Sequence, residues 1–292
     1  MPCIDLHIHS FYSDGSLSPK DLLKLGRHHG LHAMALTDHD TIEGVAELQQ
    51  LGQDAGMTII SGVEVSTIYK GHTIHILGYG FNPADQAIHN WLAPLQQERA
   101  QRNRRILAKL KELNIQIEHE ELAAISKYGQ IGRPHIAQLL IQHGVVSNFD
   151  EAFRQFLGRG KAAWVPRSTY GTSETIAMLH RIGGKAILAH PAILDPNLRL
   201  QTKLIDELVA VGLDGLEAYY PTHTIKFRKQ LLQLAEKHHL LITGGSDFHG
   251  ATRPNNQLAG IQQNFCPPAS LLGPLLAAMG MQVPRQLTSN RT

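Results

Sequence analysis

The sequence has very few cysteines. Only Cys3 and Cys266 are present, near opposite ends of a chain of 292 residues. A disulfide framework needs several paired cysteines, and a cysteine-rich zinc motif needs closely spaced ones. We therefore expect neither a disulfide framework nor a cysteine-rich zinc motif in this protein.

Long apolar runs are also missing. No segment approaches the roughly 20 apolar residues that span a bilayer, and the start, MPCIDLHIHS, lacks the basic cluster and apolar core of a secretion signal. We expect no membrane association and a cytoplasmic location. The formal charge of +2 is too small for a general nucleic-acid surface. We therefore expect no long duplex as a partner, and nothing indicates an obligate protein partner.

Histidine, by contrast, occurs 18 times, and its placement is informative. In the opening segment IDLHIHSFYSDG, apolar residues alternate with Asp5, His7 and His9, which is the period of a strand. His7 and His9 should then point the same way. Two such imidazoles could bind a metal ion, or could form a polar strand face satisfied by hydrogen bonds. One strand leaves both interpretations open.

Segments of strand character alternate with helical segments along most of the chain. A helix after the first strand is indicated by Ser18 as a cap, Pro19 in the first turn and Asp21. Short apolar strands linked by helices predict an α/β fold with a parallel sheet, and this many units indicate a β/α barrel. The further strand segments are residues 33–36, 57–66, 72–80, 185–191, 214–220 and 240–250.

A helical region interrupts this alternation. We expect a first part of the barrel at 1–90, a helical insertion that caps the substrate at 91–163, a second part of the barrel at 164–287, and a disordered tail at 288–292. The basic segment RAQRNRRILAKLK, residues 99–111, has apolar residues at helical spacing. We interpret it as an amphipathic scaffold with a solvated charged face.

Metal-type side chains gather where the apolar strands end. In a parallel barrel these ends share one rim, so residues distant in sequence would meet there. A single histidine such as His75 is more often a hydrogen-bonded core residue, but a whole series at successive strand ends favours a metal site. The series is His7, His9, Asp14, Asp38, His39, Asp40, Glu64, His75, His190, Glu217, Asp247 and His249.

Six motifs in fixed order resemble those of the polymerase and histidinol phosphatase (PHP) family of metal-dependent phosphoesterases. They are DLHIHSFYSDGSLSP, ALTDHDT, SGVEVS, HILGYG, AHP and GGSDFHG. The resemblance implies a distorted PHP-type β/α barrel with two or three divalent ions at the strand carboxyl ends. It implies one ion on His7, His9, Glu64 and Asp247, a second on Glu64, His75 and His190, and a third between Asp14, His39 and His249. Imidazole and carboxylate ligands suit Mn²⁺, Zn²⁺ or Fe²⁺, and we expect Mn²⁺.

The resemblance also implies a reaction, in which a metal-bound hydroxide attacks phosphorus in line. Asp247 and His249 are then expected to be catalytic. His223 could contact a phosphate or protonate the leaving oxygen, and an ordinary surface histidine is the alternative. Four further acids could either orient imidazoles or be solvated loop residues, namely Asp5, Asp38, Asp40 and Glu217. We favour the orienting role for Asp5 and Asp40.

Cations for a phosphoester are present in the insertion. Arg133 and His135 lie in GRPHIA, and Lys161 lies in GRGKAAWVP, although charges at such positions are usually solvated. Both motifs are similar to the PHP branch of 3′,5′-nucleotide bisphosphate phosphatases and 5′-3′ exoribonucleases. The resemblance implies removal of the 3′-phosphate from a substrate such as adenosine 3′,5′-bisphosphate. The alternatives are exonuclease action on short 5′-phosphorylated RNA, histidinol phosphatase activity, and a non-catalytic module stabilised by metal.

Overall fold

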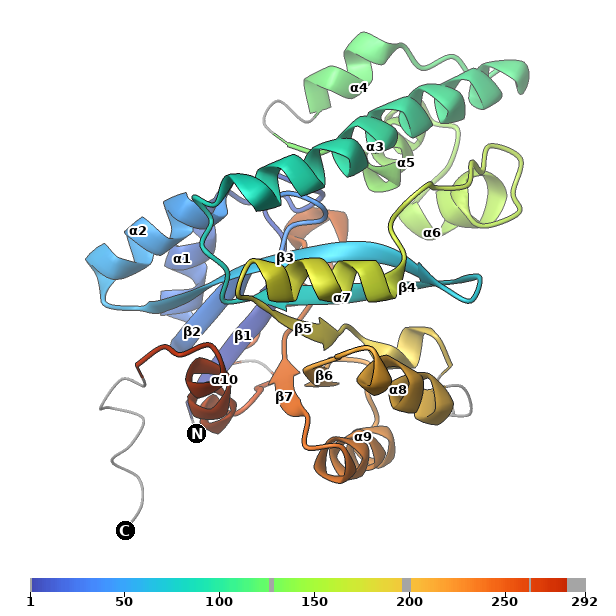
Figure 1. Cartoon of the computed structure of the whole chain (residues 1–292). Helices are drawn as coiled ribbons and strands as arrows, with labels where there is room; N and C mark the ends of the chain where they lie inside the picture. Colours follow the sequence, from blue (N-terminus) through green and yellow to red (C-terminus); the bar gives the residue numbers. More distant parts are fainter. Residues whose placement is uncertain (1, 126–128, 196–200, 263, 283–292) are drawn as a thin grey trace.

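The computed structural model describes residues 2–125, 129–195, 201–262 and 264–282 (Figure 1). Within these residues seven strands form one sheet in chain order, with helices packed around it, so the predicted α/β fold is confirmed. No helix in the described ranges is both long and apolar enough to cross a membrane. The tail predicted at 288–292 lies outside the described residues. The strands are β1 (Cys3–Ile8), β2 (Leu31–Leu36), β3 (Thr58–Tyr69), β4 (His72–Tyr79), β5 (Lys185–Leu188), β6 (Gly215–Tyr219) and β7 (Leu241–Gly244).

The first strand and helix form as their sequence signals predict. Helix α1 (Pro19–His28) begins at Ser18, whose Oγ accepts a hydrogen bond from the Asp21 amide at 3.0 Å. This bond satisfies one amide that the first helical turn leaves unpaired. Helix α2 (Val45–Ala55) follows β2, and both helices pack their apolar faces on β1 and β2.

Strand β4 corrects the expectation of a wholly parallel sheet. It pairs antiparallel with both β3 and β5, while the other neighbouring strands pair in parallel. Only Lys70 and Gly71 separate β3 from β4, and so short a connection can only reverse the chain. The first half of β4 therefore lies where the parallel strands end, and this reversal brings His75 to their rim.

The two ends of the sheet curl toward each other. Ile8, at the end of β1, forms a parallel bridge with Phe248, and the His9 amide donates to the Phe248 carbonyl at 2.9 Å. Gly245 permits this approach, because a Cβ there would lie 2.3 Å from the His7 Cβ. Among the described residues a single bridge, and not a full ladder of hydrogen bonds, joins the two ends of the sheet. This incomplete closure is consistent with the distorted barrel that the resemblance implies.

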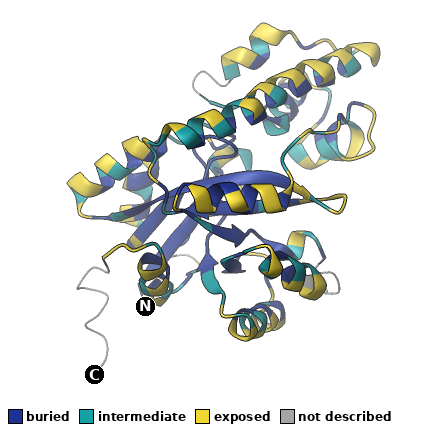
Figure 2. Ribbon diagram, viewed as in Figure 1, coloured by how far each residue is buried: buried dark blue, intermediate teal, exposed yellow. Residues whose placement is uncertain are grey.

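Helices cover the outside of the second half. Figure 2 shows the strands buried, with the exposed residues on the outward faces of the helices. This pattern follows from amphipathic helices that pack one apolar face on the sheet. These helices are α7 (Thr172–Arg181), α8 (Gln201–Ala210) and α9 (Ile225–Lys237), and α10 (Leu272–Ala278) lies beside the N-terminal end (Figure 1).

Helices α3 to α6 form the region expected to be an insertion. They are α3 (Gln86–Glu112), α4 (His119–Ile125), α5 (Arg133–Gln142) and α6 (Phe149–Ala152), with a π-helical turn at Phe153–Leu157. Ile88 and Leu92 of α3 pack in the barrel core, whereas Ile106 and Leu110 belong to a separate core among these helices. Helix α3 thus links the two cores (Figure 1). We propose that the boundary between the barrel and the insertion lies at residue 91, within this shared helix.

A disulfide joins Cys3 to Cys266, with their Cα atoms 5.2 Å apart and a sequence separation of 263 residues. The two cysteines thus form one bond, although the sequence indicated no disulfide framework. The segment after β7 runs beside the start of β1, where the Ile4 amide donates to the Pro267 carbonyl at 2.9 Å. Distance along the chain did not reveal that the two cysteines are neighbours in the fold.

Candidate metal centre

The nine predicted metal ligands gather at the rim around Glu64, on β3. The Glu64 carboxylate is 1% exposed. Its two oxygens lie between 2.6 and 3.3 Å from ring nitrogens of five histidines, namely His7, His9, His39, His75 and His190. One carboxylate therefore contacts imidazoles from β1, β4 and the ends of β2 and β5.

Two aspartates complete the cluster. Asp247 directs Oδ1 toward the imidazoles, 3.2 Å from His9 Nε2, while its Oδ2 accepts hydrogen bonds from the Tyr220 hydroxyl at 2.9 Å and Arg253 at 2.7 Å. Asp14 Oδ1 lies 3.2 Å from His249 Nε2. The cluster thus extends from His75 on β4 to the loop after β7.

Several atoms facing the cluster are buried and have no hydrogen-bond partner among the described residues. They are His7 Nε2, His9 Nε2, His39 Nδ1, Glu64 Oε2 and His249 Nε2. Buried polar atoms are normally satisfied, so unpaired atoms that converge call for a ligand. Imidazole nitrogens and carboxylate oxygens without thiolates fit a divalent metal such as Mn²⁺, Zn²⁺ or Fe²⁺.

Three overlapping groups have donor atoms close enough to share an ion. They are His7, His9, Glu64 and Asp247; His9, Asp14, His39 and His249; and His39, Glu64 and His75. The first group has the same members as the first predicted ligand set. His9 and His39 each belong to two groups, whereas the predicted sets place each in one. His190 contacts Glu64 Oε1 at 2.9 Å, beside the third group.

Three residues of the rim hold their backbone in the left-handed region. Asp40, His190 and Asp247 have φ angles of 55°, 28° and 53°. Aspartate and histidine enter this region only at some cost, and such strain concentrates at functional sites.

Glu217, on β6, orients the first histidine. Its Oε1 lies 2.9 Å from His7 Nδ1, and its Oε2 accepts the His190 amide at 2.7 Å. A carboxylate can only accept, so His7 Nδ1 carries a proton, and Nε2 is the nitrogen that faces the cluster and would bind a metal. His249 is held similarly, with Nδ1 2.8 Å from the Asp247 carbonyl oxygen.

The other acids do not orient imidazoles directly. Asp5 accepts the amides of Ser246 and Ala259, each at 2.9 Å, and burial raises its pKa to about 6. Asp38 accepts the Ser10 amide at 2.8 Å and the Ser13 hydroxyl, which lies 3.4 Å from His9 Nδ1. The role favoured for Asp5 is therefore wrong, and Asp5 fixes the backbone where β1 meets the end of β7.

Asp40 contacts arginines instead of an imidazole, which corrects its expected role as well. Its Oδ2 accepts from Arg99 at 2.6 Å and also from Arg167. Burial alone would raise the pKa of this carboxyl, but Arg167 and Arg99 outweigh burial and hold the pKa well below its usual range. Asp40 thus remains charged and fixes two guanidinium groups beside the rim.

Glu64 is ionised for a comparable reason. Burial opposes its charge, yet the surrounding imidazoles, those of His39 and His75 foremost, lower its pKa well below the usual value. An ionised carboxylate surrounded by imidazoles is a favourable ligand set for a divalent metal, which displaces the imidazole protons when it binds.

An arginine-lined cavity opens beside the cluster. Its volume is about 310 Å³, and it reaches from His75 to four arginines: Arg102, Arg133, Arg159 and Arg167. The hydroxyl side chains of Ser66, Thr73 and Thr169 also line it. Such a concentration of donors fits a phosphate group. We refer to this cavity as the arginine pocket.

Two of its arginines, the buried Arg102 and the half-buried Arg133, lie among like charges. Arg102 donates to the Val165 carbonyl at 3.0 Å, and Arg133 donates to the Leu157 carbonyl at 3.1 Å. Burial, together with the neighbouring arginines, lowers the pKa of Arg102 to about 9 and that of Arg133 to about 10. A bound anion would relieve both the burial cost and the mutual repulsion.

The interpretation of residues 99–111 as a scaffold with a solvated charged face is wrong for Arg99 and Arg102. Each is only 8% exposed. The sequence carried a signal for this, because both arginines continue the buried stripe of α3 toward Ile106 and Leu110 at helical spacing. An arginine on the apolar stripe of a helix points inward, and here Arg102 lines the arginine pocket while Arg99 pairs with Asp40.

The remaining predicted contacts fall in different places. His135 is buried, and its Nδ1 accepts the Gly132 amide at 3.0 Å. Lys161 is exposed and is not one of the described residues that line the arginine pocket. His223 is 8% exposed and so is not a surface histidine, and its two nitrogens bond to the Ala218 carbonyl at 2.9 Å and the Ala192 amide at 3.4 Å.

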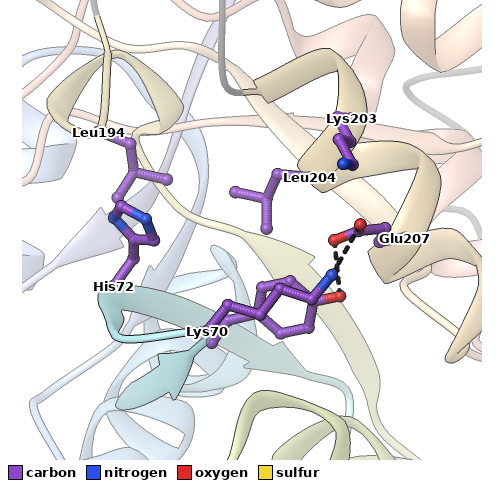
Figure 3. Close-up of a pocket in the computed structure, with 7 residues that line it drawn as sticks. Lys70, His72, Leu194, Lys203, Leu204 and Glu207 are labelled. Atoms are coloured by element: carbon purple, nitrogen blue, oxygen red, sulfur yellow. Dashed lines mark hydrogen bonds and ion pairs between the residues drawn. The ribbon is translucent and has the colours of Figure 1, made fainter.

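Another pocket lies between the β3–β4 turn and α8 (Figure 3). Lys70 and Lys203 line it, but the Lys70 ammonium bonds to Glu207 at 2.8 Å. The Tyr69 hydroxyl bonds to the same carboxylate at 2.9 Å. Because this acid already pairs with the lysine and none of the metal-type cluster lines the pocket, we do not place the reaction there.

Comparison with known proteins agrees with this geometry. The family model for the PHP domain matches residues 5–163. The chain is 37% identical over 248 residues to the 5′-3′ exoribonuclease of Haemophilus influenzae, covering 84% of this chain and 89% of that protein. It is 32% identical over 250 residues to the 3′,5′-nucleoside bisphosphate phosphatase of Chromobacterium violaceum, covering 85% and 88%. A crystal structure assigned as a metal-dependent phosphoesterase, from Bifidobacterium adolescentis, superposes with a TM-score of 0.86 at 30% identity, covering 95% and 96%.

Proposed function

The chain belongs to the PHP family of phosphoesterases, and from this premise we propose that it hydrolyses the 3′-phosphate of nucleoside 3′,5′-bisphosphates. The products are a 5′-mononucleotide and inorganic phosphate. Adenosine 3′,5′-bisphosphate is the representative substrate.

The observation that carries this proposal is that an arginine-lined pocket adjoins the candidate metal centre, which would attract a phosphate once metal is bound. The centre is the cluster around Glu64, and the arginine pocket shares His75 with that cluster. A phosphomonoester needs only the metal centre. Two phosphate groups on one small molecule account for both, with the 3′-phosphate at the cluster and the 5′-phosphate on the arginines.

The cluster residues would hold two or three divalent ions, and we propose Mn²⁺ as the metal. When bound, such ions supply a nucleophile from water and neutralise charge that develops on the phosphoryl group. The proposed ligands are His7, His9, Asp14, His39, Glu64, His75, His190, Asp247 and His249.

The protein's own residues keep these ligands and the substrate in place. Glu217 holds the His7 ring in one tautomer, and Arg253 with Tyr220 turns Asp247 Oδ1 toward the imidazoles. Asp40 fixes Arg167 at the edge of the arginine pocket. We assign the 5′-phosphate to Arg133, Arg102 and Arg167, and leave Lys161 out of the site.

Exoribonuclease action on short RNA is the second candidate. The 37% identical relative carries this name. The same two sites suit it, since a 5′-phosphorylated end on the arginines places the first internucleotide phosphate at the cluster. Hydrolysis of the bond to the 3′ oxygen would then release a 5′-mononucleotide and leave a 5′-phosphate on the shortened chain.

The test is phosphate release by the Mn²⁺-loaded protein from adenosine 3′,5′-bisphosphate, beside adenosine 3′-monophosphate and histidinol phosphate. A 5′-phosphorylated RNA trimer is assayed in parallel for mononucleotide release. We expect the bisphosphate to be preferred over both monophosphates. Activity on histidinol phosphate alone would reject the role of the arginine pocket, and inactivity on all four would favour a module in which metal is only structural.

A further inference from the structure

A second large cavity lies at the other end of the metal-type cluster. Its volume is about 470 Å³, and it is enclosed by the start of α5, by α6 with the following turn, and by the loop after β7. Residues that line it include Asn148, Phe149, Phe153, Arg253, Asn255 and Asn256. We refer to it as the aromatic pocket.

The two pockets open at opposite ends of the cluster. The arginine pocket is lined by His75. The aromatic pocket is lined by Arg253, which donates to Asp247 Oδ2 at 2.7 Å, and by Thr252, which donates to the Asp14 carbonyl at 2.7 Å. His39 lies between these ends, with its ring 5.4 Å from that of His75 and 6.2 Å from that of His249.

Arg133 connects the walls of the two pockets. It lines the arginine pocket, and its guanidinium lies 5.4 Å from the centre of the Phe153 ring, which lines the aromatic pocket. The next residue, Pro134, also lines the aromatic pocket. The start of α5 thus separates two sites of different character that adjoin one cluster.

The chemistry of the aromatic pocket does not suit a phosphate. Its single arginine, Arg253, already pairs with Asp247, and Asp150 adds an opposing negative charge. Phe149 and Phe153 line it with aromatic side chains, and Asn255 and Asn256 add side-chain amides, although the Asn256 amide nitrogen already donates to the Ser246 and Asp247 carbonyls at 3.3 and 3.2 Å. Aromatic faces combined with polar groups that can hydrogen-bond are the means by which proteins bind unpaired nucleobases.

We propose that the aromatic pocket binds the base of the second nucleotide of a 5′-phosphorylated RNA, the one that follows the scissile phosphate. This inference rests on the proposed function and extends it, because a nucleoside bisphosphate has no second nucleotide and leaves this pocket empty. In the RNA reaction water adds to phosphorus, the bond from phosphorus to the 3′ oxygen breaks, and that oxygen takes up a proton. The second nucleotide keeps the phosphate on its 5′ oxygen and remains in the pocket until the chain advances.

The variant Phe149→Leu tests this proposal, because leucine keeps the apolar contact with the insertion core and removes the ring face. Because the variant loses the stacking of one base on an aromatic ring, we expect kcat/KM for a 5′-phosphorylated dinucleotide to decrease roughly 10-fold. The variant should hydrolyse adenosine 3′,5′-bisphosphate at the wild-type rate. Phe156→Leu is the matched control, since Phe156 packs in the same core without lining the pocket.

A substrate change tests the same contact without a mutation. A 5′-phosphorylated dinucleotide that lacks its second base should react about 10-fold more slowly with the wild-type protein, and Phe149→Leu should slow it no further. If Phe149→Leu lost equal activity on the bisphosphate and on the dinucleotide, the pocket assignment would be overturned. It would also be overturned if removal of the second base left the rate of the wild-type protein unchanged. Failure of the wild-type protein on the dinucleotide alone would also overturn it, whereas failure on both substrates would reject the proposed function itself.

Discussion

The carboxylate of Glu217 lies 2.9 Å from Nδ1 of His7, and neither side chain is exposed to solvent. The two residues are 210 positions apart in the sequence and come from β6 and β1. Because this contact fixes which nitrogen of His7 faces the cluster, Glu217 controls a proposed metal ligand without itself facing the metal.

Replacing Glu217 by glutamine should weaken metal binding while preserving the fold. The amide keeps the shape of the side chain but removes the negative charge that makes the imidazole a better donor. We expect Mn²⁺ affinity, measured by calorimetry, to fall by about 10-fold or more. Glu236→Gln on the exposed face of α9 is the matched control, and equal affinities for the two variants would contradict the orienting role.

Glu64 should dominate the stabilisation of the protein by metal. A metal that binds only the folded state raises the melting temperature, and at 100-fold excess over Kd this stabilisation is about 2.7 kcal/mol. We expect Mn²⁺ to raise the melting temperature of the metal-free protein by several degrees, and Glu64→Gln to remove most of this shift. The exposed residue Glu112 supplies the control variant Glu112→Gln. An undiminished shift in Glu64→Gln would remove Glu64 from the proposed ligands.

Arg133→Ala should discriminate between substrates with one and two phosphates. Loss of a charged hydrogen bond to the 5′-phosphate, worth about 1.5–3 kcal/mol, corresponds to at least a 10-fold rise in KM for adenosine 3′,5′-bisphosphate. The KM for adenosine 3′-monophosphate should change far less. Arg104→Ala, on the exposed side of the same region, should affect neither. Parallel rises for both substrates would show that Arg133 supports the fold and does not bind the 5′-phosphate.

The link between Cys3 and Cys266 should stabilise the junction between β1 and the segment after β7. Closing a loop of this length restricts the unfolded chain, and native disulfides contribute roughly 2–5 kcal/mol. We expect reduction with dithiothreitol to lower the urea midpoint. The double variant Cys3→Ala/Cys266→Ser should have this lower midpoint and should not respond to the reductant. Two free thiols titrated in the unreduced, unfolded protein would exclude the bond.

The sequence predicted most of the fold and the composition of the cluster because both depend on local patterns. Alternation along residues 4–9 indicated a strand with two imidazoles on one face, and Ser18 marked the start of α1. Residues such as His39 and Asp247 were informative because they follow apolar strands, and strand ends converge in this kind of fold. Their assignment as ligands remains a proposal.

Other features depended on which distant segments became neighbours. Helical spacing places Arg99 and Arg102 on the buried stripe of α3, but the acid that Arg99 meets and the pocket that Arg102 lines depended on the segments packed against that stripe. The reversal at Lys70 and Gly71 brought His75 to the cluster from a strand of opposite direction. Local pattern thus determined what each segment presents. The contact of Glu217 with His7 and the joining of Cys3 to Cys266 were decided by tertiary structure, because only the curling of the sheet brings those chain segments within bonding distance.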